Sequence, residues 1–125
     1  MKSNKEAQQR LYRLIDANLN RLREGIRVVE DIYRYIYDDQ TIALRLKNIR
    51  HMARYENEKL IEARDIAGDV LKKSTQSEQE RKDLNSIIIA NIKRAQESAR
   101  VLEEAFKLVD IEASQKFKTI RYKLY

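Results

Sequence analysis

The sequence contains one helical signature twice, as IDANLNRLREGIRVVED at residues 15–31 and as IIANIKRAQESARVLEE at residues 88–104. In both copies apolar residues recur at intervals of three and four, which is the spacing of one buried stripe on an α-helix. A repeat kept only for packing would preserve the apolar positions alone, whereas here five polar positions are preserved as well. These are the pairs Asn18/Asn91, Arg21/Arg94, Glu24/Glu97, Arg27/Arg100 and Glu30/Glu103.

Helical periodicity extends outward from the first copy in both directions. A capping box at residues 3–6 predicts the start of a first helix, which ends at Asp38-Asp39. Apolar residues from Ile42 to Ile61 predict a second helix that this aspartate pair can cap, and Gly68-Asp69 ends its pattern.

The second copy predicts a third helix, and a shorter helix follows it. A polar link at 72–76 and a second capping box at 77–80 precede the third helix over 84–109. Asp110 caps the short last helix, which ends at Leu124. We therefore predict an all-α, up-down bundle of three long helices plus a short C-terminal helix, forming a single domain over residues 1–125. In this topology the first and third helices, related by the repeat, run parallel and hold Asn18 and Asn91 at the same height.

Composition excludes several classes of site. The 125 residues include no Pro, Cys or Trp and only two Gly, so Gly-rich phosphate loops, disulfides, thiolate nucleophiles and Cys-ligated zinc are excluded. The single histidine, His51, excludes a His-rich metal cage. The net charge of +6 favours an anionic partner, but basic and acidic residues interleave, which disfavours nucleic acid and membrane surfaces. The polar N-terminus and the lack of a long apolar run predict a cytoplasmic protein.

The preserved polar residues have two interpretations. The charged ones have the i,i+3 and i,i+4 spacing of solvated ion pairs on a helix surface, which is a structural role. The two asparagines fall on the buried face, where each amide needs a protein or ligand partner. Counting along the second helix places His51 level with Arg27, with Arg50 and Arg54 nearby. Such an arginine-rich centre with carboxylates among it suits phosphates and a divalent cation.

Five segments together resemble one family, the all-helical hydroxymethylpyrimidine phosphate kinases of thiamine biosynthesis. They are the segments Asp16–Asp31, Arg50-His51, Arg64–Asp69, Ala90–Glu104 and Arg121–Tyr125. This domain is often fused in front of thiamine-phosphate synthase. The resemblance implies a phosphotransferase that uses ATP and Mg²⁺ to convert hydroxymethylpyrimidine phosphate to its diphosphate. Leu71 departs from the family pattern in the loop that contains Gly68-Asp69.

The implied chemistry assigns candidate roles to the motif residues. Guanidinium groups bind phosphate through two hydrogen bonds, and the candidates are Arg21, Arg27, Arg94 and Arg100. Asn18 or Asn91 could pair with the pyrimidine, because an amide both donates and accepts hydrogen bonds. Carboxylates suit Mg²⁺, and the candidates are Glu24, Glu97, Asp69 and Glu103. His51 or Asp16 is the candidate general base for the attacking alcohol.

Two other functions stay open beside the kinase. One is a non-catalytic basic binding module for RNA or for thiamine-phosphate synthase, and the other is a structural bundle made by duplication. The sequence leaves open both the oligomeric state and the identity of the general base.

Overall fold

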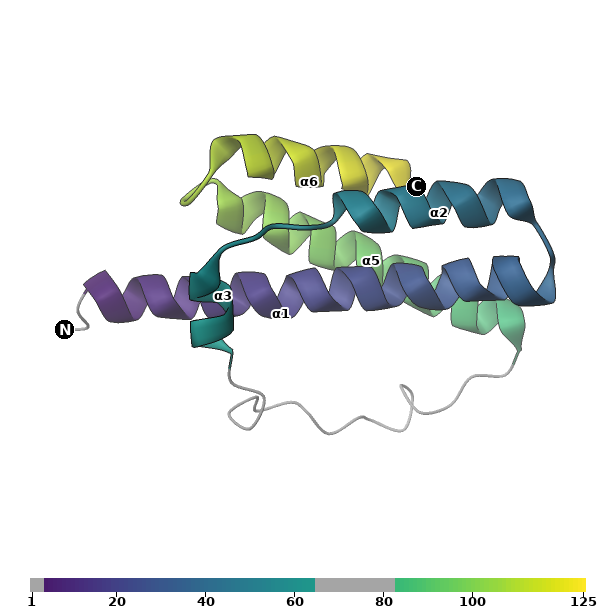
Figure 1. Ribbon diagram of the computed structural model, residues 1–125, viewed down its shortest axis with the longest axis horizontal. Coiled ribbons are helices and arrows are strands. Elements are labelled where there is room, and N and C mark those ends of the chain that lie inside the picture. Colours follow the sequence, from purple (N-terminus) through teal and green to yellow (C-terminus); the bar gives the residue numbers. More distant parts are fainter. Residues whose placement is uncertain (1–3, 65–82) are drawn as a thin grey trace.

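The computed structural model describes residues 4–64 and 83–125, which fold into a bundle of helices (Figure 1). These elements are α1 (Asn4–Asp31), the π-helical segment η1 (Ile32–Ile36), α2 (Gln40–Met52), α3 (Glu58–Ala63), α5 (Leu84–Phe106) and α6 (Ile111–Lys123). The described residues form no strand, so the predicted all-α class is confirmed. Within these two ranges, no helix combines the length and the apolar character needed to cross a membrane.

Aspartate side chains begin three of the helices. The carboxylate of Asp39 accepts a hydrogen bond from the amide of Ile42 at 3.0 Å, and that of Asp110 accepts bonds from two amides at the start of α6. Both caps were predicted from the sequence. Helix α5 begins instead at Asp83, which accepts a hydrogen bond from the amide of Ser86 at 2.8 Å. The predicted capping box at 77–80 lies outside the described residues, as does Ser3 of the first one.

The predicted second helix is interrupted. Its first part, α2, ends at Met52, and Asn57 caps the separate helix α3 by accepting a hydrogen bond from the amide of Lys59 at 3.0 Å. Between them Ala53 is completely buried, and the ring of Tyr55 packs on Phe106 with 4.6 Å between centroids. Tertiary packing of this segment therefore overrides the local helical periodicity.

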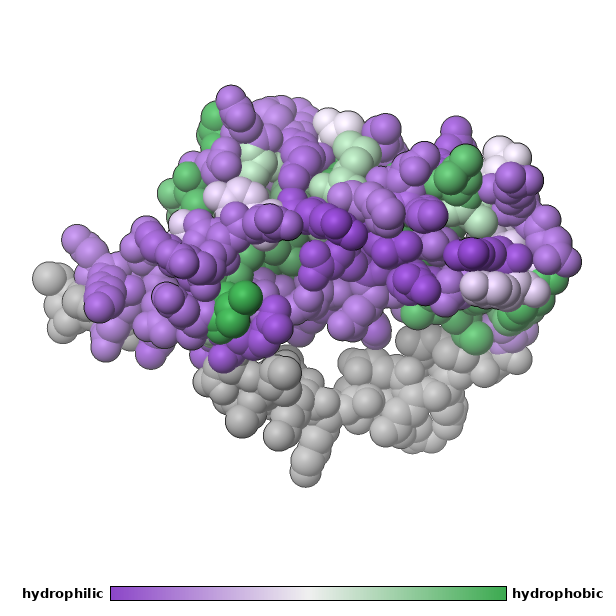
Figure 2. All heavy atoms as spheres, viewed as in Figure 1, coloured by the Kyte–Doolittle hydropathy of each residue, from purple (hydrophilic) through white to green (hydrophobic). Residues whose placement is uncertain are grey.

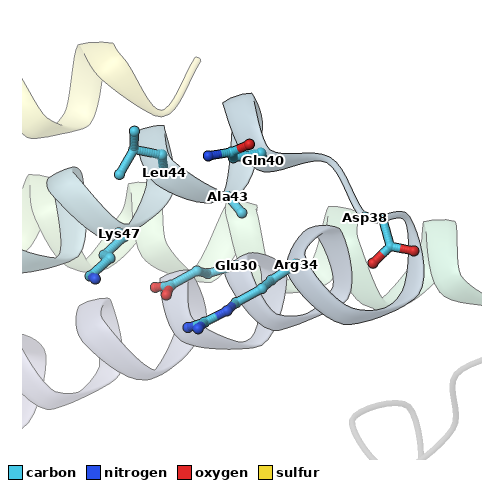
Figure 3. A pocket seen from close by; sticks show the side chains of 7 residues that line it. All are labelled: Glu30, Arg34, Asp38, Gln40, Ala43, Leu44 and Lys47. Atoms are coloured by element: carbon cyan, nitrogen blue, oxygen red, sulfur yellow. The ribbon is translucent and has the colours of Figure 1, made fainter.

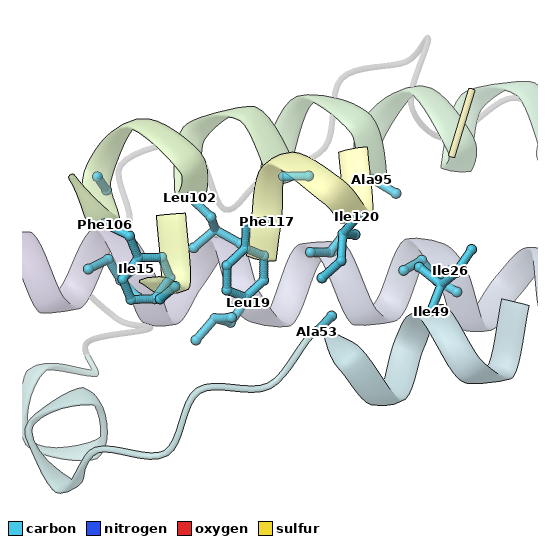
Figure 4. Close-up of a cluster of buried hydrophobic side chains, with 14 of the residues drawn as sticks. Ile15, Leu19, Ile26, Ile49, Ala53, Ala95, Leu102, Phe106, Phe117 and Ile120 are labelled. Carbon is cyan, nitrogen blue, oxygen red and sulfur yellow. The ribbon is translucent and has the colours of Figure 1, made fainter. Parts of the chain in front are cut away.

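Helix α5 runs antiparallel to α1, so the predicted parallel arrangement is wrong (Figure 1). Figure 4 shows the same direction, because Phe106 lies near Ile15 at one end while Ala95 lies toward Ile26 at the other. A short link after α3 would have forced a parallel course. Residues 65–82, however, are enough chain to span about 60 Å, more than the length of α1, so α5 can begin at the opposite end.

One continuous apolar core lies where α1, α5 and α6 meet (Figure 4). The rings of Phe106 and Phe117 stack at its centre with centroids 5.2 Å apart, and both are completely buried. The predicted stripe of α1 is buried from Ile15 to Val29, where its members include Leu19, Leu22 and Ile26, but Leu14 is exposed. Each such side chain contributes about 1.5–3 kcal/mol on burial, so this stripe supplies much of the driving force for folding.

Gly25 allows α1 and α5 to approach closely. A Cβ atom at this position would lie 2.9 Å from the carbonyl oxygen of Asn91 and 3.5 Å from the Cβ of Ala95. This contact also fixes the register of the two helices. Because Asn18 lies seven residues before Gly25, it is separated from the level of Asn91 by about 10 Å along α1. The prediction that the two asparagines lie level is therefore wrong.

Candidate functional site: an arginine-lined cleft between α1 and α2

Cationic side chains gather in one cleft between α1 and the segment that ends α2. The cleft has a volume of about 440 Å³ and is lined by Arg23, Glu24, Arg27, Arg50, Arg54, Tyr55 and Glu56. Four arginines thus face two glutamates in the lining. Two of the four are also paired outside it, Arg27 with Asp31 at 3.2 Å and Arg50 with Glu30. The face that contains this groove is largely hydrophilic (Figure 2). The structure therefore brings Arg27, Arg50 and Arg54 together, as counting along the predicted helices had suggested.

A buried ion pair anchors Arg50 in this cleft. Its Nε donates to one carboxylate oxygen of Glu30 at 2.6 Å, and a terminal nitrogen donates to the other at 3.2 Å. The side chain of Glu30 is only 2% exposed, and the hydrogen bond that it accepts from Arg50 raises the pKa of Arg50. Glu30 had been predicted on the solvated outer face. It is buried because its partner comes from α2 rather than from its own helix.

The segment between α2 and α3 is held from two sides. The ammonium group of Lys116 on α6 donates to the carbonyl oxygen of Arg54 at 2.5 Å. On the same segment the ring of Tyr55 packs on Phe106, and burial raises the pKa of the Tyr55 phenol. Burial also lowers the pKa of Lys116. These contacts fix the backbone that presents Arg54 to the cleft.

His51 is an exposed residue in the last turn of α2, next to the cleft. Its pKa is lowered, first by partial desolvation and then by the positive charges of Arg50, Arg54 and Lys47. This positive environment disfavours a protonated imidazole when no anion is present. Its predicted role as a base stays a prediction, since His51 does not line the cleft itself.

The asparagines and the other predicted phosphate ligands are not gathered at this cleft. Asn18 and Asn91 each donate to the carbonyl oxygen four residues earlier in their own helix, at 2.9 and 2.8 Å. Arg21 and Arg94 are exposed and lie outside the lining of the cleft. Arg100, on α5, pairs with Glu104 at 3.4 Å, as expected for a surface ion pair. One site shared by both copies of the signature is therefore not what the structure shows.

Two predicted carboxylates are engaged in ion pairs elsewhere. Asp16 accepts two hydrogen bonds from Arg64, at 2.8 and 2.9 Å, which joins the end of α3 to α1. Glu103 is buried and accepts a hydrogen bond from Arg121 on α6 at 3.0 Å.

The predicted metal ligands do not form a cluster where the structure describes them. Glu24 lines the cleft and Glu97 is exposed on α5, while Asp69 lies outside the described residues. Among the described residues, no three acidic or histidine side chains lie close enough to hold a metal ion. The described residues therefore offer no group of three ligands for a metal ion, and the ATP and Mg²⁺ expected from the resemblance stay predictions.

Sequence reasoning missed the partners of the buried carboxylates. Arg50 and Arg121 each follow a buried isoleucine near the end of a helix, at Ile49 and Ile120. This Ile-Arg pair occurs 20 and 18 residues after Glu30 and Glu103, respectively. The dipeptide alone is not a specific signal, because it also occurs at Ile26-Arg27. The longer pattern Lys-x-Ile-Arg, at 47–50 and 118–121, relates the two arginines to each other.

The family model and the known proteins that match this chain both relate it to thiamine biosynthesis. The model of the ThiD2 family matches residues 13–125. Thiamine-phosphate synthase of Thermosynechococcus vestitus is 41% identical over 119 residues, which cover 94% of this chain and 34% of that protein. Thiamine-phosphate synthase of Nostoc punctiforme is 38% identical over 96% of this chain and 35% of its own length. That of Rhodopirellula baltica is 41% identical over 92% of this chain and 32% of its own length. No solved structure matches the chain.

These relatives correct the predicted activity. The sequence led us to expect a hydroxymethylpyrimidine phosphate kinase, but the relatives are named thiamine-phosphate synthase, which is a different transferase. The assignment as a kinase is therefore wrong. The chain spans about a third of the length of these relatives.

Proposed function

Because the chain belongs to the ThiD2 family, we propose that it is a phosphate-binding domain of thiamine biosynthesis that works beside thiamine-phosphate synthase. The proposed ligand is hydroxymethylpyrimidine phosphate, bound with its phosphoryl group in the arginine cleft. The observation that carries this proposal is the convergence of Arg23, Arg27, Arg50 and Arg54 on one cleft of about 440 Å³.

The chemistry of the lining supports a phosphoryl group. Guanidinium groups bind phosphate oxygens through paired hydrogen bonds, and such charge-assisted bonds are stronger than neutral ones. Arg50 is already held in position by Glu30, so its orientation costs little entropy when a ligand binds. Tyr55 also lines this cleft and provides an aromatic residue near the proposed position of the pyrimidine.

The relatives support a role next to the synthase. They are about three times as long as this chain, and the matched part includes nearly all of this chain. A binding domain of this kind would hold a phosphorylated pyrimidine close to the synthase. RNA is disfavoured as a ligand, because Glu24 and Glu56 interrupt the positive charge of the cleft.

Calorimetric titration with hydroxymethylpyrimidine phosphate tests the proposal. We expect Arg27→Gln and Arg54→Gln each to weaken binding at least about tenfold, the loss of roughly one charge-assisted contact. Arg45→Gln is the matched control, because Arg45 is an exposed arginine of α2 that lies outside the cleft. Equal affinity of the parent and both cleft variants would refute the proposal.

A further inference from the structure

A second pocket continues the groove between α1 and α2 on the other side of the Glu30–Arg50 pair. It has a volume of about 330 Å³ and is lined by Glu30, Arg34, Asp38, Gln40, Ala43, Leu44 and Lys47 (Figure 3). We propose that this pocket is a second phosphoryl-binding subsite, in which Arg34 and Lys47 bind an anionic group of a small-molecule ligand. This proposal rests on the proposed function and extends it. The groove between α1 and α2 then binds phosphoryl groups at two positions, the arginine cleft and this pocket.

The charges of the lining favour an anion. The charged ends of Arg34 and Lys47 both point toward the carboxylate of Glu30, while Asp38 lies at the other end of the pocket (Figure 3). Both oxygens of Glu30 already accept hydrogen bonds from Arg50, so this carboxylate is neutralised. Among the described residues, neither Arg34 nor Lys47 has an ion-pair partner, although the Arg34 guanidinium lies 5.1 Å from the centroid of the Tyr35 ring.

The pocket lies beside an irregular stretch of backbone. The end of α1 widens into the π-helical segment η1, and Asp38 has a left-handed conformation with φ of 50°. A non-glycine residue in this conformation and a π-helical turn are both uncommon, and each is found more often at functional sites. The link from Asp31 to Asp39 is two residues longer than the link between the corresponding residues of the other hairpin, Glu104 and Asp110.

The hairpin of α5 and α6 provides an internal comparison. Helices α2 and α6 both have an aspartate cap and the same length, and each carries the arginine that binds a buried glutamate of the preceding long helix. In the second hairpin the hydroxyl of Ser114 donates to the carbonyl oxygen of Glu103 at 2.7 Å, which closes the space between the helices. Ala43 occupies the equivalent position in the first hairpin and has no group that could form this bond, so the groove stays open.

The distance between the two subsites suits two separate phosphoryl groups. Arg27, on α1, lines the arginine cleft and Arg34, on η1, lines the second pocket, and these residues are seven positions apart in one continuous helical stretch. Seven residues correspond to about 10 Å along a helix. This separation is too long for the two phosphorus atoms of one diphosphate, so each subsite is filled by its own phosphoryl group.

Inorganic pyrophosphate is a suitable probe, followed by amide chemical shifts and by the stoichiometry from calorimetry. For the parent we expect two binding sites, one that shifts the amides of residues 23–27 and 54–56 and one that shifts those of residues 34–47. Arg34→Met and Lys47→Met should each weaken the second site at least about tenfold and leave the first unchanged. Lys118→Met is the matched control, because Lys118 occupies the position in α6 that Lys47 occupies in α2.

The outcomes separate this inference from the proposed function. Binding only at residues 23–27 and 54–56 would overturn the second subsite and leave the proposed function intact. Binding only at residues 34–47 would support the subsite and contradict the arginine cleft. Two sites that are both unaffected by Arg34→Met and Lys47→Met would overturn the assignment of these side chains.

Discussion

Removal of Arg50 should expose how strongly the buried ion pair governs stability. The side chain of Glu30 is 2% exposed in the parent, and in Arg50→Met its carboxylate loses both of its hydrogen bonds from the guanidinium. Breaking one partner of a buried pair costs about 3–5 kcal/mol, a large fraction of a typical unfolding free energy of about 5–15 kcal/mol. We therefore expect a melting temperature lower by roughly 10–20 °C.

The double variant Glu30→Met/Arg50→Met tests the cause of this loss. Replacing both partners with apolar side chains removes the uncompensated charge, so at least half of the lost stability should return. Urea unfolding followed by circular dichroism measures all three proteins on one scale. If Arg50→Met unfolds at the same urea concentration as the parent, or the double variant is no more stable than the single one, the argument from burial is refuted.

Three further changes have defined outcomes. Gly25→Ala should lower the urea midpoint of unfolding. The added Cβ would lie 2.9 Å from the Asn91 carbonyl oxygen, and this clash costs about 1–3 kcal/mol, which outweighs a helix-propensity gain of about 1 kcal/mol. A more stable variant would contradict the close approach of the two helices. Sulfate, whose own charge is constant over this range, should bind more tightly as the pH falls from 7.5 to 5.5. The lowered pKa of His51 leaves its imidazole neutral at the higher pH, and protonation of the imidazole at lower pH adds positive charge beside the cleft. In calorimetry His51→Gln should remove this pH dependence, and an unchanged dependence would exclude His51 as its source. Asp110→Ala should lower the free energy of unfolding in urea by about 1–2 kcal/mol, because two backbone amides at the start of α6 lose their hydrogen-bond acceptor. No change would mean that the cap is dispensable.

Local signals predicted the helices and two of their caps. The apolar stripe of α1 and the caps Asp39 and Asp110 depend on residues within a few positions of one another, so their physics is present in the sequence itself. The interruption after Met52 depends on a contact between Tyr55 and Phe106, which are 51 positions apart. No local pattern carries this information, and the prediction of one continuous helix failed for that reason.

The candidate site was predictable only in part. Arg27, Arg50 and Arg54 could be placed together because α1 and α2 form an antiparallel hairpin with a short turn. The direction of α5 could not be derived, because the chain between α3 and α5 is long enough to permit either course. Glu30 was misplaced because its spacing to Arg34 fits a surface ion pair as well as it fits burial against another helix.

From the contrast between the two hairpins we infer that the arginine cleft depends on positions that differ between them as well as on the shared Arg27. Both hairpins keep a buried glutamate bound to an arginine, which stabilises the packing of each long helix against its shorter partner. In the second hairpin, Gln96 donates to the carbonyl oxygen of Leu124 at 2.9 Å, at the position where the first hairpin has Arg23 beside the open cleft. A neutral amide that satisfies the backbone leaves no group to bind a ligand there, whereas a cation beside Arg27 adds to a positive field. We infer that the preserved glutamates hold the scaffold, and that differing positions such as Arg23 join the preserved Arg27 to give only the first hairpin a cleft for an anion.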